Sequence, residues 1–536
     1  MRSFIGNTLL SVIFLVLLRD AKSAVLNVPE EFSTIQNALN ASLMGDTVRV
    51  SPGVYHEFLI CSTDSIFITG WYSVDTLTEL RTILDPIPGG LDTPSTMVLT
   101  GNAAKLQNLA FFNRPEMREP VWPTRTGGVL HTGESLSLQY CRFDSISNAV
   151  NAEHFIRADH CTFVGCQWHC LFPSNEGTVH AENCTFDGSK RWLVYGGSGS
   201  RILNCSFRIH DAPSTYLLRL HGNDVYVRGC QFTSVDGVFS SVLVSPQGDF
   251  RIAECVFQNV TGARAMIEVL LDCSGAEVDT PIVIANNRFQ DYEGSELGGT
   301  TAIAMGCQNP NPGYFGLVAG NTFEDGLATG GNIPGIAISG SATLMDNWFE
   351  RLSPDATPDV MMLRSAQDSL LARDNSFLPP GLATGSNGSY FDARLNWWGD
   401  STGPFHASLN PGGLGSEVGN GVLFEPWLTQ PPDSSDTTSA VDDHSEHSVP
   451  TDLGLHVFPN PFNPVTTLRF SLPANGNVIV RVHDVLGREV ERADLGLLAA
   501  GEHTLKLNGA KWSSGVHFAT VSTNYYSSTA KLLLLK

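Results

Sequence analysis

Hydrophobic positions between residues 136 and 377 follow one short pattern that recurs along the chain. In most copies, hydrophobic residues lie five and three positions before a Cys or Asn, and Phe lies two positions after it. Neighbouring copies are 20 (141 to 161) to 34 (287 to 321) residues apart. Such a period is typical of solenoids, in which one repeat alone cannot bury its hydrophobic face. The pattern centres on Cys141, Cys161, Cys184, Cys205, Cys230, Cys255, Asn287, Asn321, Asn347 and Asn375.

Alternation within each copy predicts a β-strand. Polar residues such as Arg157, His180 and Arg251 stand between the two hydrophobic positions, which is the period of two expected when one strand face is buried. A helical repeat would need a period of 3.6 over ten or more residues. Strands of successive copies should therefore stack about 4.8 Å apart, with Phe residues in one interior row and Cys, then Asn, in another.

The Asn-x-Phe copies resemble the turns of the right-handed parallel β-helices of the pectin-lyase-like superfamily, which contain an internal Asn ladder. The resemblance implies an all-β fold, with a right-handed parallel β-helix over residues 24–428. It is specific for the fold and says little about function, because one fold supports many activities.

Both ends of the predicted β-helix have sequences that would close it. Ser33 or Thr34 can cap a short amphipathic helix that begins near Ile35, and a helix across an open end covers its side chains and strand edges. Residues 395–427, with paired tryptophans and Gly-Pro turns, resemble the exit segment of secreted β-helix repeat proteins. We interpret the tryptophans as a plug, although paired tryptophans can also stack on sugars.

The first residues and the region after the β-helix have other roles. Residues 1–23 have the features of an export signal, with Arg2, a hydrophobic run over 9–18 and small residues at 21–23. An uncleaved anchor is the alternative, but the run is short for a membrane span, so we expect no membrane insertion after signal removal. Residues 429–452 are polar and acidic, which predicts a disordered linker.

Residues 453–536 follow a different pattern. Alternating runs at 467–472, 478–483, 504–507, 516–522 and 529–535 predict a small β-sandwich. The opening VFPNPFNP, the turn from Asp484 to Arg488 and the closing segment KLLLLK (531–536) resemble the immunoglobulin-like type A sorting domain of the bacterial type IX secretion system. The resemblance implies contact with the secretion machinery, export by way of the periplasm, and attachment to the outer-membrane surface or extracellular release.

Charge and cysteine content narrow this picture. A net charge of −22 argues against nucleic acid or an anionic membrane surface as a partner. The negative charge also disfavours binding of an acidic polysaccharide, unless the protein has a local basic site or a cation bridges the protein and the polysaccharide. Eleven Cys residues would normally suggest disulfides in an exported protein, but six share the Asn position. We interpret these six as buried thiols, while pairing between adjacent rungs stays open because their spacing fits a disulfide.

A second hydrophobic strand precedes each ladder copy, and several of these strands are hydrophobic on both faces. With Leu218 and Leu220 inward, Val194 and Val244 would face outward or lie near an edge. A sheet that is hydrophobic on both faces is usually covered. We therefore favour a covering loop, residues 114–128, over an exposed hydrophobic groove.

Catalytic residues are hard to find. Superfamily members that cleave polyuronates use an Asp/Glu cluster to hold Ca²⁺ and Arg or Lys as the base, and hydrolytic relatives use paired Asp. No Asp pair shares a column in this sequence. The outward candidates are Arg219 as base, Glu268 as cation ligand and His221 as a third substrate-binding residue; solvated charges are the alternative.

Histidines and cysteines do not complete a metal site. Cys166, His169 and Cys170 lack a fourth ligand at zinc spacing. The histidines of the middle copies occupy several different columns, so most should be exposed turn residues; they are His131, His154, His160, His169, His180, His210 and His221. We expect no metal and no cofactor, with Ca²⁺ needed only by a lyase.

The sequence therefore favours an exported protein, secreted or on the cell surface, that binds a polysaccharide or another envelope component without catalysis. The alternative is a polysaccharide lyase or glycoside hydrolase with a divergent site near Arg219, His221 and Glu268. The two differ in whether carboxylates gather in a cleft beside those residues or a loop covers that face.

Overall fold

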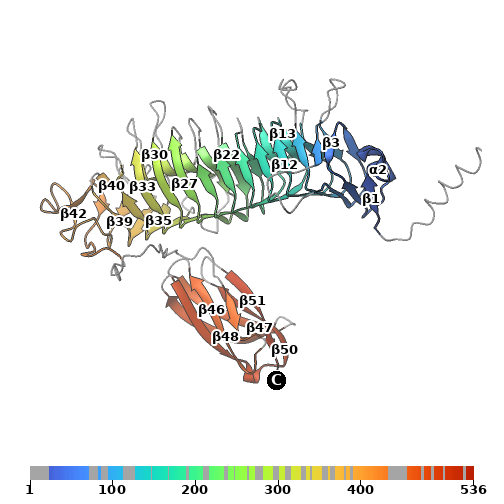
Figure 1. The fold of residues 1–536 in the computed structure, drawn as a ribbon. Helices are drawn as coiled ribbons and strands as arrows, with labels where there is room; N and C mark the ends of the chain where they lie inside the picture. The colour runs from blue at the N-terminus through green and yellow to red at the C-terminus, as the bar shows by residue number, and fades with distance from the viewer. Residues whose placement is uncertain are drawn as a thin grey trace, which may run out of the picture. The chain divides into compact units, whose positions relative to one another are not determined.

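The structure is a computed structural model, and it divides into two compact units, residues 1–196 and 197–536, which we describe in turn (Figure 1). The export signal (1–22), most of the predicted covering loop (113–126) and most of the linker (433–452) lie outside the described residues. The described residues are 23–71, 82–85, 95–112, 127–146, 148–166, 168–174, 176–188, 192–208, 216–233, 240–246, 248–261, 265–271, 282–293, 301–307, 315–327, 334–338, 341–352, 360–362, 369–379, 382–386, 390–432, 455–460, 462–472, 476–484, 488–498, 501–522 and 527–535.

The first unit is a stack of coils whose strands form three parallel sheets. Sheet A contains, in spatial order, β1 (Val25–Val28), β2 (Thr47–Val50), β5 (Ile66–Thr69), β8 (Ala103–Gln107), β11 (Ser135–Gln139), β14 (Phe155–Asp159) and β17 (Val179–Glu182). Sheet B contains β3 (Gly53–Tyr55), β6 (Thr82–Leu84), β9 (Ala110–Phe112), β12 (Arg142–Asp144), β15 (Thr162–Val164) and β18 (Thr185–Asp187). Sheet C contains β4 (Leu59–Cys61), β7 (Met97–Leu99), β10 (Val129–His131), β13 (Asn148–Ala152), β16 (His169–Pro173) and β19 (Val194–Gly196). This is the predicted parallel β-helix.

The predicted capping helix is present as α2 (Ile35–Ala41). Thr34 is its N-cap and accepts a hydrogen bond from Asn37 N–H, as the sequence suggested. The carboxylate of Glu57 accepts two further bonds from the N–H groups of Ile35 and Gln36, both 3.0 Å long. Ile35, Ala38 and Leu39 are buried. Among the described residues, no helix is long and hydrophobic enough to span a bilayer.

The predicted interior rows are confirmed in the first unit. Phe111, Phe143, Phe163 and Phe186 stack with nearly parallel rings 4.7–5.0 Å apart. This distance matches the strand spacing, so each ring packs directly on the next. The ladder cysteines are buried free thiols. Burial raises the pKa of the Cys161 thiol well above its usual value, which keeps it protonated and chemically inert.

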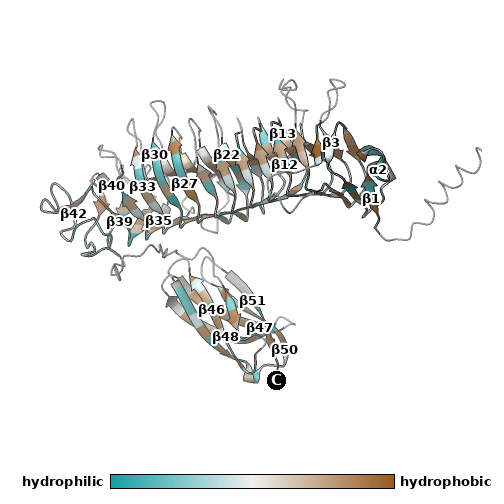
Figure 2. Ribbon diagram, viewed as in Figure 1, coloured by the Kyte–Doolittle hydropathy of each residue, from teal (hydrophilic) through white to brown (hydrophobic). Residues whose placement is uncertain are grey.

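The second unit continues with the same three kinds of sheet and then a separate antiparallel domain. Its sheet A contains β20 (Arg201–Leu203), β23 (Val225–Arg228), β26 (Phe250–Ala253), β29 (Ile282–Ala285), β32 (Phe315–Ala319), β35 (Ser341–Met345), β38 (Ser369–Arg373), β41 (Tyr390–Asp392) and β44 (Val422–Leu423). Its sheet B contains β21 (Ser206–Arg208), β24 (Gln231–Thr233), β27 (Val256–Thr261), β30 (Arg288–Glu293), β33 (Thr322–Leu327), β36 (Trp348–Glu350) and β39 (Ser376–Phe377). Its sheet C contains β22 (Tyr216–Gly222), β25 (Ser240–Pro246), β28 (Ala265–Leu271), β31 (Thr301–Cys307), β34 (Ile336–Ile338), β37 (Val360–Met362), β40 (Leu382–Ser386), β43 (Gly415–Val418) and β42 (Pro404–Phe405). Hydrophobic residues recur along these strands (Figure 2).

The Asn ladder of the second unit is a continuous chain of buried hydrogen bonds. Asn347 is 1% exposed, and its Oδ1 accepts from both N–H and Nδ2 of Asn321 at 3.0 Å. Its Nδ2 donates to the Val318 carbonyl and to Asn375 Oδ1, both at 2.8 Å. The ladder extends one rung beyond the predicted copies, because Asn396 Oδ1 accepts from Asn375 in the same way.

Most ladder side chains also brace the turn that precedes them. The residue just before the ladder position has a left-handed backbone, with φ of 50° at His160, 63° at Gly320 and 57° at Asp374. The ladder side chain reaches back across this residue: Cys161 Sγ donates to Asp159 O at 3.4 Å, and Asn375 Nδ2 to Arg373 O at 2.9 Å. A single residue therefore turns the chain from sheet A into sheet B.

Trp398 closes the last coil, which confirms the predicted plug. It is fully buried, and its ring stacks on Phe377 with centroids 4.9 Å apart. Beside it, Asp392 accepts hydrogen bonds from Arg373 Nη2 and Arg394 Nη2, both at 2.7 Å. These contacts fix the strand that leaves the coil stack.

The C-terminal residues form two antiparallel sheets around one hydrophobic core, in agreement with the predicted sandwich. One sheet has the order β45 (His456–Phe458), β46 (Val465–Leu472), β49 (Gly501–Asn508), and the other β48 (Glu489–Leu498), β47 (Gly476–Asp484), β50 (Gly515–Ser522), β51 (Ser527–Leu534), with a short 3-10 helix η2 (Gly509–Lys511). The sequence prediction missed β48. Its pairing with β47 shifts register near Gly496, which breaks the period of two.

Replacing a ladder Asn should destabilise the β-helix strongly. Asn347→Ala removes the acceptor of the Asn321 backbone N–H and the side-chain donor to the Val318 carbonyl, at about 1–3 kcal/mol for each buried group. We expect a loss of several kcal/mol in chemical denaturation followed by tryptophan fluorescence. Asn347→Cys should cost less, because Cys fills this position in earlier coils. Thr322→Ala on the outward face is the control, and an equal loss there would contradict the ladder's role.

The Asp392 ion pairs should make stability depend on acid pH. The hydrogen bond from Arg394, together with Arg373, lowers the pKa of Asp392 well below its usual value. This stabilisation is fully present above the unfolded-state pKa of about 3.9 and is lost as the pH falls through the folded-state pKa. Asp392→Asn should cost about 2–3 kcal/mol at neutral pH and flatten the decline of Tm below about pH 4. The exposed Glu417→Gln should do neither.

Candidate functional site

The three predicted site residues lie on sheet C of the second unit. Arg219 and His221 are on β22, and Glu268 is on β28. Arg219 is in register with Leu243 of β25, and Leu243 with Glu268. Arg219 and Glu268 therefore share one outward column but lie two strands apart, roughly 10 Å between backbones, with a leucine between them. His221 belongs to the next outward column, beside Ser245.

Among the described residues, this outward column places no second carboxylate beside Glu268. Glu268 is 2% exposed and Leu243 is 5% exposed, so both are covered although they lie on the outward face. Beyond Glu268, the column continues with Ala304 and Ala337. Within the described part of the chain, no three His, Cys, Asp or Glu residues lie close enough together to hold a metal ion. The segment predicted to cover this sheet, 114–128, is mostly outside that part.

The expected outward positions of Val194 and Val244 were wrong. Val244 is in register with Leu220, and Val194 with Leu171, and all four side chains are fully buried or nearly so. They therefore face inward. The loops that precede these strands differ in length, so the in-out alternation could not be transferred from one coil to the next without the register.

The expectation of exposed histidines was correct for His154 and His160 but wrong for two others. His131 is fully buried, and its Nε2 donates to the Gly101 carbonyl at 3.0 Å. Burial lowers the pKa of His131, so it is neutral at physiological pH. His169 is 3% exposed, and its Nδ1 donates to the Trp192 carbonyl at 3.1 Å. His210 lies outside the described residues.

His169 belongs to an aromatic cluster on sheet C of the first unit, which the sequence reading did not identify. Four rings form a closed circuit: His169 to Phe172 at 4.7 Å, Phe172 to Tyr195 at 5.2 Å, Tyr195 to Trp192 at 5.7 Å, and Trp192 back to His169 at 5.4 Å between centroids. We call these four residues the aromatic cluster. Phe172, Trp192 and Tyr195 are partly exposed.

Register places two members of the cluster, Phe172 and Tyr195, in the outward column of sheet C. Phe172 is in register with Asn151, whereas the neighbouring Leu171 points inward beside Val150. Asn151 Oδ1 is buried and accepts no hydrogen bond from the described residues. A buried acceptor without a donor is costly. Ring side chains three positions apart in two successive upstream segments, His169 with Phe172 and Trp192 with Tyr195, were the sequence signal for this site.

The comparisons with known proteins identify the C-terminal domain. Residues 456–535 match the family model described as a secretion system C-terminal sorting domain, which spans the two antiparallel sheets. Asp484 and Arg488 lie within this match, and the Asp484 carboxylate accepts from Arg488 N–H at 3.0 Å and from Arg488 Nε at 2.7 Å. The comparison with curated proteins returned no match.

Solved structures give only distant likenesses. The catalytic domain of a GH87 α-1,3-glucanase in complex with nigerose has a TM-score of 0.38 at 8% identity, over 69% of each chain. The A-module of the mannuronan C-5 epimerase AlgE4 from Azotobacter vinelandii has a TM-score of 0.32 at 10% identity, over 66% of this chain and 95% of that one. These values carry no argument about activity. The chain is therefore an exported protein, a parallel β-helix that ends in a secretion system C-terminal sorting domain.

Proposed function

We propose that this exported protein binds a polysaccharide or another glycan of the cell envelope through the aromatic cluster, without catalysis, at the cell surface or after release. The observation that carries the proposal is the closed circuit of four rings on an outward face. Aromatic side chains offer a large rigid surface at low entropic cost, and the C–H face of a pyranose ring is a suitable partner for it.

The chemistry around the rings supports a neutral sugar. Tyr195 is partly exposed, and its hydroxyl group can both donate to and accept from a sugar hydroxyl. A binding site of mostly aromatic surface with a few polar atoms is the usual composition of a small-molecule site. The His169 bond to the Trp192 carbonyl holds the two rings in place, so the platform is ordered before a ligand arrives.

Isothermal titration of the full chain with a panel of neutral glucans, mannans and xylans tests the site. We expect Trp192→Ala and Tyr195→Ala each to weaken binding roughly tenfold, because one aromatic contact is worth about 1–1.5 kcal/mol. Trp348→Ala removes a tryptophan that is 36% exposed on β36 and should leave affinity unchanged. The absence of binding across the panel, or unchanged binding in the double variant, would contradict the proposal.

A lyase assay separates this proposal from the lyase alternative. If the protein only binds glycans, uronic-acid polymers incubated with it, with and without Ca²⁺, should give no unsaturated product by ultraviolet absorbance. The reason is that the column between Arg219 and Glu268 contains Leu243 and continues in alanines. Product formation that disappears in Arg219→Ala would establish the alternative instead.

A further inference from the structure

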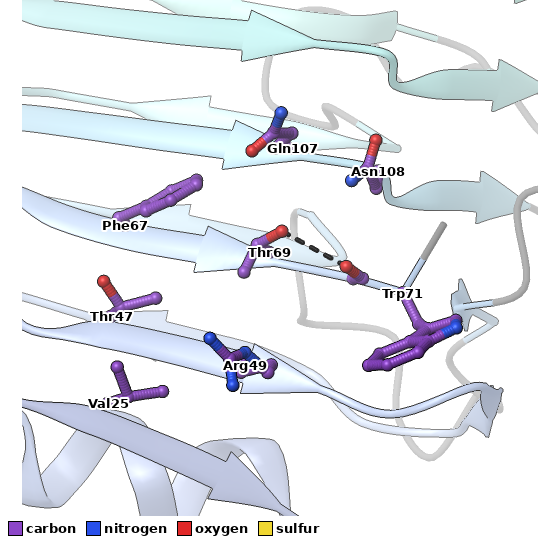
Figure 3. A pocket seen from close by; sticks show the side chains of 9 residues that line it. Val25, Thr47, Arg49, Phe67, Thr69, Trp71, Gln107 and Asn108 are labelled. Carbon is purple, nitrogen blue, oxygen red and sulfur yellow. Dashed lines mark hydrogen bonds between the residues drawn. The ribbon is translucent and has the colours of Figure 1, made fainter. Parts of the chain in front are cut away.

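A groove on sheet A of the first unit presents cations in an otherwise acidic chain. It has a volume of about 390 Å³ and is lined by nine residues: Val25, Thr47, Arg49, Phe67, Thr69, Gly70, Trp71, Gln107 and Asn108. Figure 3 shows Arg49, Thr69 and Gln107 following one another across three neighbouring strands. Trp71, directly after β5, is 50% exposed.

Two cations flank this groove and neither is neutralised. Arg49 and Lys105 are both exposed, and neither forms an ion pair with a carboxylate among the described residues. Lys105 is instead held with its Nζ 4.8 Å from the centroid of the Phe67 ring, a cation–π contact that fixes its position while leaving its N–H donors available. No carboxylate lines the groove.

A second groove, in the other unit, also contains arginines, but there each arginine forms an ion pair with an aspartate. It has a volume of about 260 Å³ and contains Arg201 and Arg251. There Arg201 pairs with Asp224 at 2.6 Å and Arg251 with Asp249 at 3.2 Å. The groove on the first unit therefore differs in chemistry and not only in shape, since its cations lack such partners.

We propose that the groove around Arg49, Trp71 and Lys105 binds an anionic saccharide through its carboxylates. The planar Arg49 guanidinium matches a carboxylate with two parallel hydrogen bonds, and Trp71 stacks on the sugar ring beside it. The amides of Gln107 and Asn108 lie on the rim for hydroxyl groups. This is the local basic site that a chain of net charge −22 requires before an acidic glycan can approach.

The spacing of the cations sets the size of the ligand. Register places Lys105 beside Phe67, and Arg49 beside Thr69. The two cations are therefore two strands and two residues apart, roughly 12 Å between backbones. Two cations at this spacing suit an oligomer that presents two acidic sugars, one carboxylate to each cation.

Titration of the full chain with hexagalacturonate, and with a neutral galactan of equal length, tests the proposal. At low ionic strength we expect Arg49→Gln and Lys105→Gln each to weaken hexagalacturonate binding about tenfold and Trp71→Ala about fivefold. Arg157→Gln is the matched control: it removes one exposed charge from the same outward column of sheet A and should leave affinity unchanged. Physiological salt should weaken wild-type binding.

Other outcomes would overturn the proposal. Equal losses in Arg157→Gln would mean that only net charge matters. Inorganic hexametaphosphate that competes equally, with no effect of Trp71→Ala, would identify a nonselective anion surface. Trp192→Ala distinguishes this site from the aromatic cluster. If this variant loses hexagalacturonate binding, the ligand binds at the aromatic cluster and not in the groove. Hexagalacturonate binding without any neutral-glycan binding would refute the proposed function and support this groove.

Discussion

The whole β-helix depends on a turn of one residue. In every ladder coil the chain passes from sheet A to sheet B through one left-handed residue, a backbone state that costs roughly 1–2 kcal/mol for most residue types. The side chain that follows offsets this cost by donating back across the turn, as Cys161 and Asn375 do. Because the turn is so short, it holds neighbouring strands in strict register, and only this register lets the Phe rings stack.

Much of this arrangement was predictable from the sequence, because equivalent positions in a stack must satisfy the same surroundings. The Phe row, the buried thiols and the Trp398 plug all follow from that rule. The left-handed position was not recognised, since residues as different as His160, Gly320 and Asp374 occupy it. Only the backbone is constrained there, while the side chain lies at the surface. The β48 strand was missed for a related reason, an irregularity near Gly496 that hides the alternation.

The candidate sites were harder to predict, because they depend on how strands of sheet C align. Loops of different length precede these strands, so sequence spacing does not reveal that Leu243 separates Arg219 from Glu268. The aromatic cluster required the same register, which brings Phe172 beside Tyr195. The groove at Arg49 required something else, namely the knowledge that no carboxylate lines it among the described residues. Such an absence cannot be read from a sequence with 54 acidic residues.

The direction of the ladder bonds has a consequence for assembly. Along the Asn ladder, the N–H of each rung is accepted by the side chain of the rung that follows it in sequence, as Asn287 is by Asn321, and the same bond joins Cys161 to Cys184 and Cys255 to Asn287. These coils are completed only when their successors are in place, and growth toward the C-terminus satisfies a pending donor at each such step. The fold is suited to vectorial construction from the α2 end, with each new turn templated by the last.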